Sequence, residues 1–301
     1  MKKKPSVIRH YMEYAGLRMI CVLLRLVPAE LCFQAARLLG PALAILAPLR
    51  KKVVLENLRR AFPDEDSQSL GRLVRETYRH FLYFGLEFIF LTRWSGEETA
   101  RRISAVDGME HLEQAKSTGR PFLVVTGHMG NWEMMGSYFA DKGYDLSVLA
   151  KPMHNPLTDR YINAARRKAG MEVIPTGDNV IRDVLSAVKR KRHVVFLADQ
   201  DARRAGIFVP FLGTQASTFT GPALFSVRTG CPILPVYDIW EGPGRHRIIF
   251  LPPVYPPEKP ADRDSAVRGL TEAHVRGLEE MVRRYPSQYF WFHRRWKTQP
   301  K

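Results

Sequence analysis

The first third of the chain repeats apolar residues with the period of a helix, and the remainder breaks into short apolar runs. Residues 16–27 and 31–49 are long apolar stretches, and residues 53–62 and 67–92 carry apolar side chains every three or four positions. This spacing predicts helices in all four segments. Pro63 ends the third helix, because proline has no backbone N–H and its ring clashes with the preceding helical turn.

Short apolar runs alternate with amphipathic stretches from about residue 103 onward. The runs are typical of strands and the stretches of helices, so the alternation predicts an α/β sheet with helices on its faces. The expected strands are 121–126, 145–150, 172–175, 193–198, 232–239 and 246–254, and the expected helices are 131–142, 156–169, 178–190 and 262–284. We therefore expect a mixed sheet flanked by helices over residues 63–301, preceded by a helical region over residues 1–62.

The N-terminal 60 residues combine apolar helices with positive charge, since they hold twelve Lys and Arg against three acidic residues. Arg18, Arg25 and Arg37 interrupt the apolar stretches, so a clean membrane span is not expected. A cleaved signal peptide is disfavoured, because the stretch contains arginines and no small-residue cleavage site follows. We expect a membrane-associating helix pair, with apolar faces in the membrane surface and arginines at lipid phosphates. Packing of both helices on the domain core is the alternative.

Composition excludes a disordered or fibrous protein but adds an unusual charge. Of the 301 residues, 45% are hydrophobic, and Lys and Arg outnumber Asp and Glu by 46 to 30, for a net charge of +16. Such a charge indicates an anionic partner: nucleic acid, acidic lipid or acidic protein. No recognised nucleic-acid motif is present, so nucleic acid is the least favoured. The three cysteines are widely spaced in apolar surroundings and are expected to be reduced core residues: Cys21, Cys32 and Cys231.

The segment TGHMGNWE, residues 126–133, follows the first expected strand of the α/β region. Sites in open α/β sheets gather at the carboxyl ends of strands, which places His128 where chemistry is expected. Glu133 follows in the first helical turn, where its carboxylate can accept a hydrogen bond from one imidazole nitrogen while the other takes a proton. The pattern favours a general base that acts on a substrate hydroxyl. A turn histidine with only a structural role is the alternative.

Other site chemistries lack the residues that they need. A zinc hydrolase requires clustered ligands, but the nearest histidines to His128 are His111 and His154, in other segments. A serine hydrolase of the α/β type requires a G-x-S-x-G turn, and no convincing one is present. We therefore expect neither a metal nor a cofactor. A non-catalytic, basic membrane-binding protein stays open as an alternative.

The segment GHMGNWE resembles the HxGNWE motif of the bacterial lipid A secondary acyltransferases, the lauroyl and myristoyl transferases of the lysophospholipid acyltransferase superfamily. The chain resembles this family in four further segments, in order: ENLRRAFP at 56–63, NPLTDRYINAARRKAG at 155–170, ADQDARRAGIFVPFLG at 198–213 and PSQYFWFHRRWKTQP at 286–300. Glu133 and the lack of a Pro-Glu-Gly-Thr block favour this branch over the glycerolipid branch. Some relatives acylate other glycolipids, such as phosphatidylinositol mannosides, so the acceptor stays open.

The resemblance implies a fold like that of the glycerolipid acyltransferases and a role for each matched residue. His128 would deprotonate an acceptor hydroxyl, Glu133 would orient it, and Arg166 would stabilise the oxyanion of the thioester. The alternative for Arg166 is a solvated face of a basic helix. The residues assigned to substrate binding are Asn131, Asp199 and Gln200, although Asp199 can instead brace a loop.

The resemblance also implies the partners and the place of the reaction. The acyl donor would be acyl carrier protein, an acidic protein that suits the basic charge. The acceptor would be an anionic glycolipid at the cytoplasmic face of the bacterial inner membrane, acylated directly without an acyl-enzyme. The aromatic face of residues 67–92 is typical of a core and is also suited to hold an acyl chain. Residues 289–297 fit either a membrane interface or a closed core that leaves the cations outside: Arg294, Arg295 and Lys297.

Overall fold

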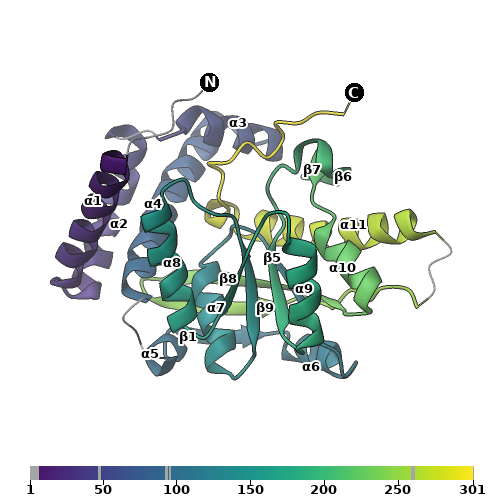
Figure 1. The fold of residues 1–301 in the computed structure, drawn as a ribbon. Coiled ribbons are helices and arrows are strands. Elements are labelled where there is room, and N and C mark those ends of the chain that lie inside the picture. Colours follow the sequence, from purple (N-terminus) through teal and green to yellow (C-terminus); the bar gives the residue numbers. More distant parts are fainter. Residues whose placement is uncertain (1–6, 47–48, 92–93, 95, 259–261, 301) are drawn as a thin grey trace.

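The structure is a computed structural model that describes residues 7–46, 49–91, 94, 96–258 and 262–300. It confirms an α/β fold built on one mixed sheet (Figure 1). The strands lie in the order β1-β9-β8-β2-β5-β3-β4. Their bounds are β1 (Ile103–Asp107), β2 (Leu123–Thr126), β3 (Leu146–Ala150), β4 (Glu172–Pro175), β5 (His193–Leu197), β8 (Ile233–Gly242) and β9 (Arg245–Phe250). Neighbouring strands are parallel except β8 and β9, which pair antiparallel.

Helices cover both faces of the sheet, which explains the continuous apolar runs of its central strands. In β2, Val124 packs with α6 and α7, while Leu123 and Val125 pack with α9, α10 and α11. On the first of these faces α8 lies beside α7, joined to it by an ion pair between Arg166 and Glu133. The bounds are α6 (Met109–Lys116), α7 (Trp132–Asp141), α8 (Pro156–Lys168), α9 (Val180–Lys189), α10 (Gly221–Thr229) and α11 (Arg263–Arg284).

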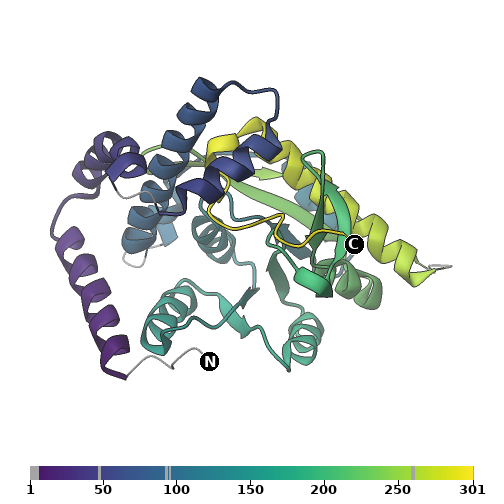
Figure 2. The same ribbon diagram turned by 90° about the horizontal axis from the view of Figure 1, so that it is seen from above.

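The first four helices of the described residues are α1 (Val7–Arg25), α2 (Ala29–Leu46), α3 (Lys51–Ala61) and α4 (Ser67–Leu91). Figures 1 and 2 show α1 and α2 at one side of the molecule. Phe33 of α2 packs on Tyr83 of α4, whereas Val54 and Leu58 of α3 enter the main core with β8, β9 and α11. The predicted domain boundary at residue 62 stays a prediction, and α3 shares its core with the α/β part.

The length and hydropathy of the N-terminal helices bear on whether they can span a membrane. Among the described residues, no single helix is long and apolar enough to cross a membrane. Helix α1 and residues 29–40 of α2 pass the same test only as a pair, and the two are bent by 112° with respect to each other.

All six expected strands are confirmed, and the structure adds shorter elements before and between them. Strand β1 is an edge strand that pairs with β9 alone, and its half-buried sequence lacks a clear apolar alternation. The hairpin of β6 (Ile207–Phe211) and β7 (Thr214–Thr218) lies outside the main sheet and packs on α11. The remaining additions are α5 (Gly96–Ala100), α6 and α10. The cysteines are buried and free, as expected: Cys21, Cys32 and Cys231.

The aromatic C-terminal segment, residues 286–300, closes the core. Trp291 is fully buried and Trp296 is nearly so, which decides between the two interpretations of this segment. The expectation that Arg295 lies outside is wrong, because its guanidinium is buried and donates to the Ser217 carbonyl at 2.6 Å. The exposed cations of the segment are Arg294 and Lys297.

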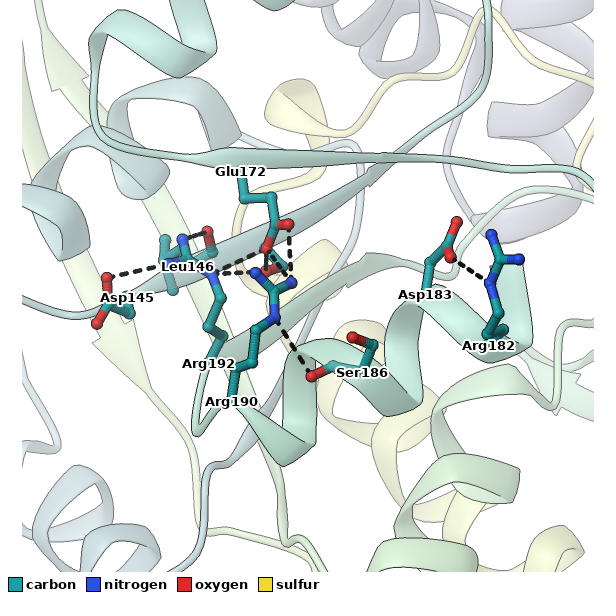
Figure 3. A network of polar contacts seen from close by, with 9 residues as sticks. Asp145, Leu146, Glu172, Arg182, Asp183, Ser186, Arg190 and Arg192 are labelled. Atoms are coloured by element: carbon teal, nitrogen blue, oxygen red, sulfur yellow. Dashed lines mark hydrogen bonds and ion pairs between the residues drawn. The ribbon is translucent and has the colours of Figure 1, made fainter. Parts of the chain in front are cut away.

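A polar network joins the amino ends of β3, β4 and β5 (Figure 3). Glu172, the first residue of β4, accepts hydrogen bonds from Ser147 at 2.6 Å and from Arg190 at 2.8 Å. Arg192 lies 3.0 Å from the same carboxylate and also donates to the Leu146 carbonyl. These contacts fix the end of the sheet opposite to the carboxyl ends of its strands.

We expect Glu172→Gln to lower the free energy of unfolding at about pH 7 by about 1 kcal/mol, since partly exposed ion pairs contribute up to about that amount. Burial alone raises the pKa of Glu172, but Ser147, Arg190 and Arg192 lower it below its ordinary value of 4.5. The stability that this carboxylate contributes is therefore present above its unfolded-state pKa and is lost as the pH falls through the folded-state pKa.

Urea unfolding of wild type and variant at about pH 7 and at about pH 4 measures this difference, which should shrink at the lower pH. The matched control is Asp183→Asn, which breaks the exposed pair with Arg182 in the same region and should change stability by only a few tenths of a kcal/mol. An equal loss for Glu172→Gln at both pH values would contradict the expectation.

Candidate active site

The pairing of two neighbouring strands brings His128 and Asp199 together. Strands β2 and β5 are parallel, and Thr126 at the end of β2 is in register with Leu197 at the end of β5. His128 and Asp199 each follow two residues later, so they emerge at the same edge of the sheet. The Asp199 carboxylate accepts the His128 backbone N–H at 2.9 Å and lies 2.7 Å from His128 Nδ1.

The Asp199 carboxylate is suited to hold one tautomer of the imidazole. It is buried, and burial alone would raise its pKa, but the charge and hydrogen bonds of His128 hold that pKa well below the usual 3.8. An ionised Asp199 accepts a hydrogen from Nδ1 and leaves the lone pair of Nε2 to accept a proton. The His128 side chain keeps 20% of its surface exposed.

Glu133 has a different partner from the one expected. It lies in the first turn of α7, and both of its oxygens are engaged by Arg166 of α8, with Nε at 3.1 and 3.2 Å. The expected hydrogen bond from His128 to Glu133 is therefore wrong, because the helix directs Glu133 toward α8 while parallel strand pairing supplies Asp199. Burial lowers the pKa of Arg166, but Glu133 more than offsets this effect and raises it.

The Arg166 guanidinium has two partners within the protein and stays partly exposed. Its Nη1 donates to Asn163 Oδ1 at 3.0 Å, and its side chain retains 19% exposure. A guanidinium fixed in this way by Glu133 and Asn163 keeps N–H groups near the surface, where they can donate to an anionic ligand.

Two of the three expected substrate-binding residues are buried. Asn131 is fully buried and caps α7: its Oδ1 accepts the Met134 N–H at 3.0 Å and its Nδ2 donates to Glu87 at 3.0 Å. This occupation gives Asn131 a structural place rather than a ligand contact, which corrects the expectation. Asp199 is the partner of His128, so of these three residues Gln200 alone is exposed, with its Nε2 at 3.4 Å from His128 Nε2.

The turn between β2 and α7 requires glycine at position 130. Gly130 has φ +56°, a conformation that other residues rarely adopt. A Cβ atom built there would lie 1.8 Å from the Asp238 carbonyl oxygen, which is impossible without a shift of backbone. The close approach of β8 thus sets the path of the chain just after His128.

An aromatic pocket opens beside His128. It is lined by α4, the start of α7 and the C-terminal segment, and it is small and partly open to solvent. The Trp132 ring lies 4.9 Å from the His128 ring and 4.2 Å from the Phe84 ring, measured between centroids. The other aromatic residues that line the pocket include Phe81, Tyr289, Phe290 and Phe292. The aromatic face of α4 therefore contributes both to the core and to a pocket that His128 also lines.

The C-terminal segment also holds the histidine turn, a role that sequence reasoning missed. The Phe290 N–H donates to the His128 carbonyl at 2.8 Å, and the Gly130 N–H donates to the Gln288 carbonyl at 3.2 Å. Asn57 of α3 donates both amide hydrogens to this segment, to the Trp291 carbonyl at 2.8 Å and to His293 at 2.7 Å. No local signal points to these contacts, because the partners lie far apart in the chain.

Comparisons with known proteins agree with this arrangement. The model of the family "Bacterial lipid A biosynthesis acyltransferase" matches residues 1–298. The lipid A biosynthesis palmitoleoyltransferase of Escherichia coli (strain K12) is 25% identical over 97% of this chain and 93% of its own length. The lauroyltransferase of the same strain is 25% identical over 97% of this chain and 94% of its own length.

A further relative is named for a different acceptor. The phosphatidylinositol mannoside acyltransferase of Mycobacterium tuberculosis (strain ATCC 25618 / H37Rv) is 31% identical over 59% of this chain and 54% of its own length. The family model, by contrast, covers nearly the whole chain, from the N-terminal helices to the segment that holds His128. The protein is thus an acyltransferase that belongs to the bacterial lipid A biosynthesis acyltransferase family.

Proposed function

We propose that the protein transfers a fatty acyl chain from an acyl-carrier-protein thioester to a hydroxyl group of a lipid A precursor, at the cytoplasmic face of the bacterial inner membrane. The observation that carries this proposal is the pair of His128 with the buried Asp199, set at the mouth of an aromatic pocket. The pair provides a base for a hydroxyl, and the pocket provides an apolar surface for an acyl chain. Membership of the family supports the acceptor class.

In the proposed mechanism, His128 Nε2 takes the proton of the acceptor hydroxyl as its oxygen attacks the thioester carbonyl. Asp199 stabilises the imidazolium that forms, and the exposed N–H groups of Arg166 stabilise the oxyanion of the tetrahedral intermediate. Glu133 positions Arg166 rather than His128. When the intermediate collapses, the C–S bond breaks and the imidazolium returns its proton to the leaving thiolate, so that the ester and a free thiol are the products.

Direct transfer, without an acyl-enzyme, is supported by the burial of the Cys231 thiol. Cys231 is buried, with 1% of its surface exposed, and burial raises the pKa of its thiol. A thiol of this kind is a poor nucleophile at neutral pH, since the thiolate is the reactive form. An acyl-enzyme on Cys231 is therefore not part of the proposal.

The acyl-carrier-protein donor is supported by charge. Exposed cations follow the site residues in the chain, at Arg167 after Arg166 and at Arg203 and Arg204 shortly after Asp199. Positive side chains around a site accelerate the approach of an acidic partner by steering it from a distance. The same cations suit an acceptor that carries phosphate groups.

Membrane association is supported by the outer surface of α1 and α2. Large apolar side chains of these helices and of the turn between them are more than half exposed: Val7, Ile8, Tyr11, Met12, Met19, Ile20, Leu23, Leu26, Leu31, Leu38 and Leu39. Such an exposed apolar surface on a basic helix is typical of a helix that lies in a membrane interface. Arg25 also donates to Tyr161 at 3.0 Å and Arg18 lies over the Tyr161 ring, and the contact of these arginines with lipid phosphates stays a prediction.

Another glycolipid stays the alternative acceptor, supported by the similarity to a phosphatidylinositol mannoside acyltransferase. The alternative of another class, a non-catalytic, basic membrane-binding protein, is set aside because the chain belongs to an acyltransferase family.

The function is tested by acyl transfer from acyl-carrier-protein thioesters, with wild type and His128→Ala at matched folded protein. The acceptors are a lipid A precursor, a phosphatidylinositol mannoside and lysophosphatidic acid. We expect transfer to the lipid A precursor, reduced about 100- to 10,000-fold in the variant, the range for loss of a general base. Transfer to another acceptor alone would reassign the acceptor, and equal transfer by His128→Ala would reject the proposed base.

A second prediction separates the two carboxylates. In Asp199→Asn the new amide can donate to Nδ1, which places the proton on Nε2 and blocks the base, so kcat should fall by roughly 1,000-fold or more at constant protein stability. Glu133→Gln keeps the His128–Asp199 pair and loosens Arg166, so its loss should be smaller, about 10- to 100-fold. Steady-state kinetics with both variants decide the order, and a larger loss in Glu133→Gln would favour the pairing expected from sequence.

A third prediction concerns the membrane. Replacing Met12, Met19 and Leu23 together by Gln should weaken binding to anionic liposomes more than 10-fold, because each buried side chain contributes roughly 1.5–3 kcal/mol. The matched control replaces the exposed Met109 and Ile181, which lie on helices of the α/β part. Liposome co-sedimentation measures both, and equal binding by the α1 variant and wild type would contradict the membrane-surface role of α1.

A further inference from the structure

A cluster of three ionisable side chains lies buried behind the histidine turn. Glu87 comes from α4, Asp238 from β8 and His246 from β9, and each is at most 1% exposed. His246 Nδ1 lies 2.8 Å from Asp238 Oδ1, and His246 Nε2 lies 3.1 Å from Glu87 Oε1. The imidazole therefore joins two carboxylates that belong to different parts of the fold.

Both carboxylates also bind Asn131, three residues after His128. Asp238 Oδ1 accepts the Asn131 backbone N–H at 2.8 Å, and Glu87 Oε2 accepts the Asn131 Nδ2 hydrogen at 3.0 Å. One carboxylate thus fixes the backbone at this position and the other fixes the side chain. Because Asn131 is the N-cap of α7, its place sets where the helix begins and where the preceding turn runs.

The charge state of the cluster follows from its contacts. Burial alone lowers the pKa of His246, but Asp238 and Glu87 raise it to about 10. His246 is therefore an imidazolium at neutral pH and donates from both nitrogens, whereas a neutral imidazole has one donor only. Removing one member would leave an uncompensated charge in the interior. Buried ionic groups of this kind add little net stability compared with apolar residues, so their presence calls for another role.

The same turn is held at a neighbouring position. His80 of α4 lies with its Nε2 3.2 Å from the Gly130 carbonyl, and burial lowers the pKa of His80 to about 4. A neutral His80 can donate this hydrogen bond. The Gly130 backbone also contacts Asp238 so closely that a Cβ atom at position 130 would overlap the Asp238 carbonyl oxygen. Gly130 and Asn131 therefore both contact the cluster, and they follow His128 by two and three residues.

We propose that Glu87, Asp238 and His246 are positioning residues that act through Asn131 to fix the turn carrying His128. The inference rests on the proposed function, because it assigns a purpose to the exact place of His128 Nε2. A base must be held within a fraction of an ångström of its productive position, and a 1 Å displacement costs about 100-fold in rate. Asn131 then affects the rate of transfer without contact with either substrate.

The test uses Asn131→Ser and Glu87→Gln in the full-length protein. Serine keeps an N-cap acceptor for α7 but lacks the amide that Glu87 binds. Glutamine keeps the shape of Glu87 but removes its charge. We expect kcat to fall about 10- to 100-fold in each variant, with KM for both substrates within about twofold of wild type. The matched control is Ser226→Ala. Ser226 lies on α10, away from the turn, and its buried hydroxyl donates to the Cys231 carbonyl. Loss of this hydrogen bond should leave kcat unchanged.

A second measurement does not depend on activity. Diethyl pyrocarbonate modifies the free nitrogen of an accessible imidazole, and mass spectrometry reports the rate at His128. This rate should change several-fold in Asn131→Ser and Glu87→Gln and stay constant in Ser226→Ala. An unchanged labelling rate in both cluster variants would overturn the proposal. A change in labelling with equal transfer by wild type and His128→Ala would instead support the positioning of His128 and reject its proposed function as a base.

The kinetic outcomes are equally decisive. A rise in KM at constant kcat in Asn131→Ser would overturn the proposal in favour of substrate binding by Asn131. A fall in kcat that matches the loss of folded protein, as judged by thermal unfolding and seen also in Ser226→Ala, would reduce the cluster to a stabilising role and overturn it too.

Discussion

The parallel pairing of β2 with β5 is the constraint on which the active site depends. It places the residues that follow the two strands at one edge of the sheet, and so joins His128 to a carboxylate 71 residues away. Burial makes that carboxylate a strong partner, because a charge in the interior is stable only when it is matched by a close donor. Glu133 of α7 does not bind His128 and binds Arg166 instead. The motif residues His128 and Glu133 therefore belong to two separate polar pairs, His128 with Asp199 and Glu133 with Arg166.

The turn that carries His128 is held on several sides by distant parts of the chain. Asp199 accepts the backbone N–H of His128, and the C-terminal segment donates to the His128 carbonyl. The buried cluster binds Asn131. Asn57 in turn holds the C-terminal segment from α3. The short segment around His128 is therefore supported by residues of α3, α4, β8 and β9. This explains why a small site requires nearly the whole length of the chain.

The N-terminal helices connect the proposed membrane surface to the same site. Arg18 and Arg25 of α1 contact Tyr161 on α8, the helix that also carries Arg166. These cations contact α8 within the protein, and the exposed apolar residues of α1 and α2 form the surface proposed to meet a bilayer. A lipid acceptor bound at the surface would meet a helix that is packed directly against an element of the active site.

The sequence by itself determined the strands, the long helices, the place of His128 after β2 and the acyltransferase family. These follow from local periodicity, from turn chemistry and from ordered motifs, all of which are written in neighbouring residues. It did not determine β1 or the β6–β7 hairpin, whose short, half-buried sequences lack a clear period. Nor did it determine that Asp199 rather than Glu133 binds His128, or that Asn131 faces a buried cluster. Those contacts join residues from separate elements, and only the order of strands in the sheet and the packing of helices on it decide which side chains meet.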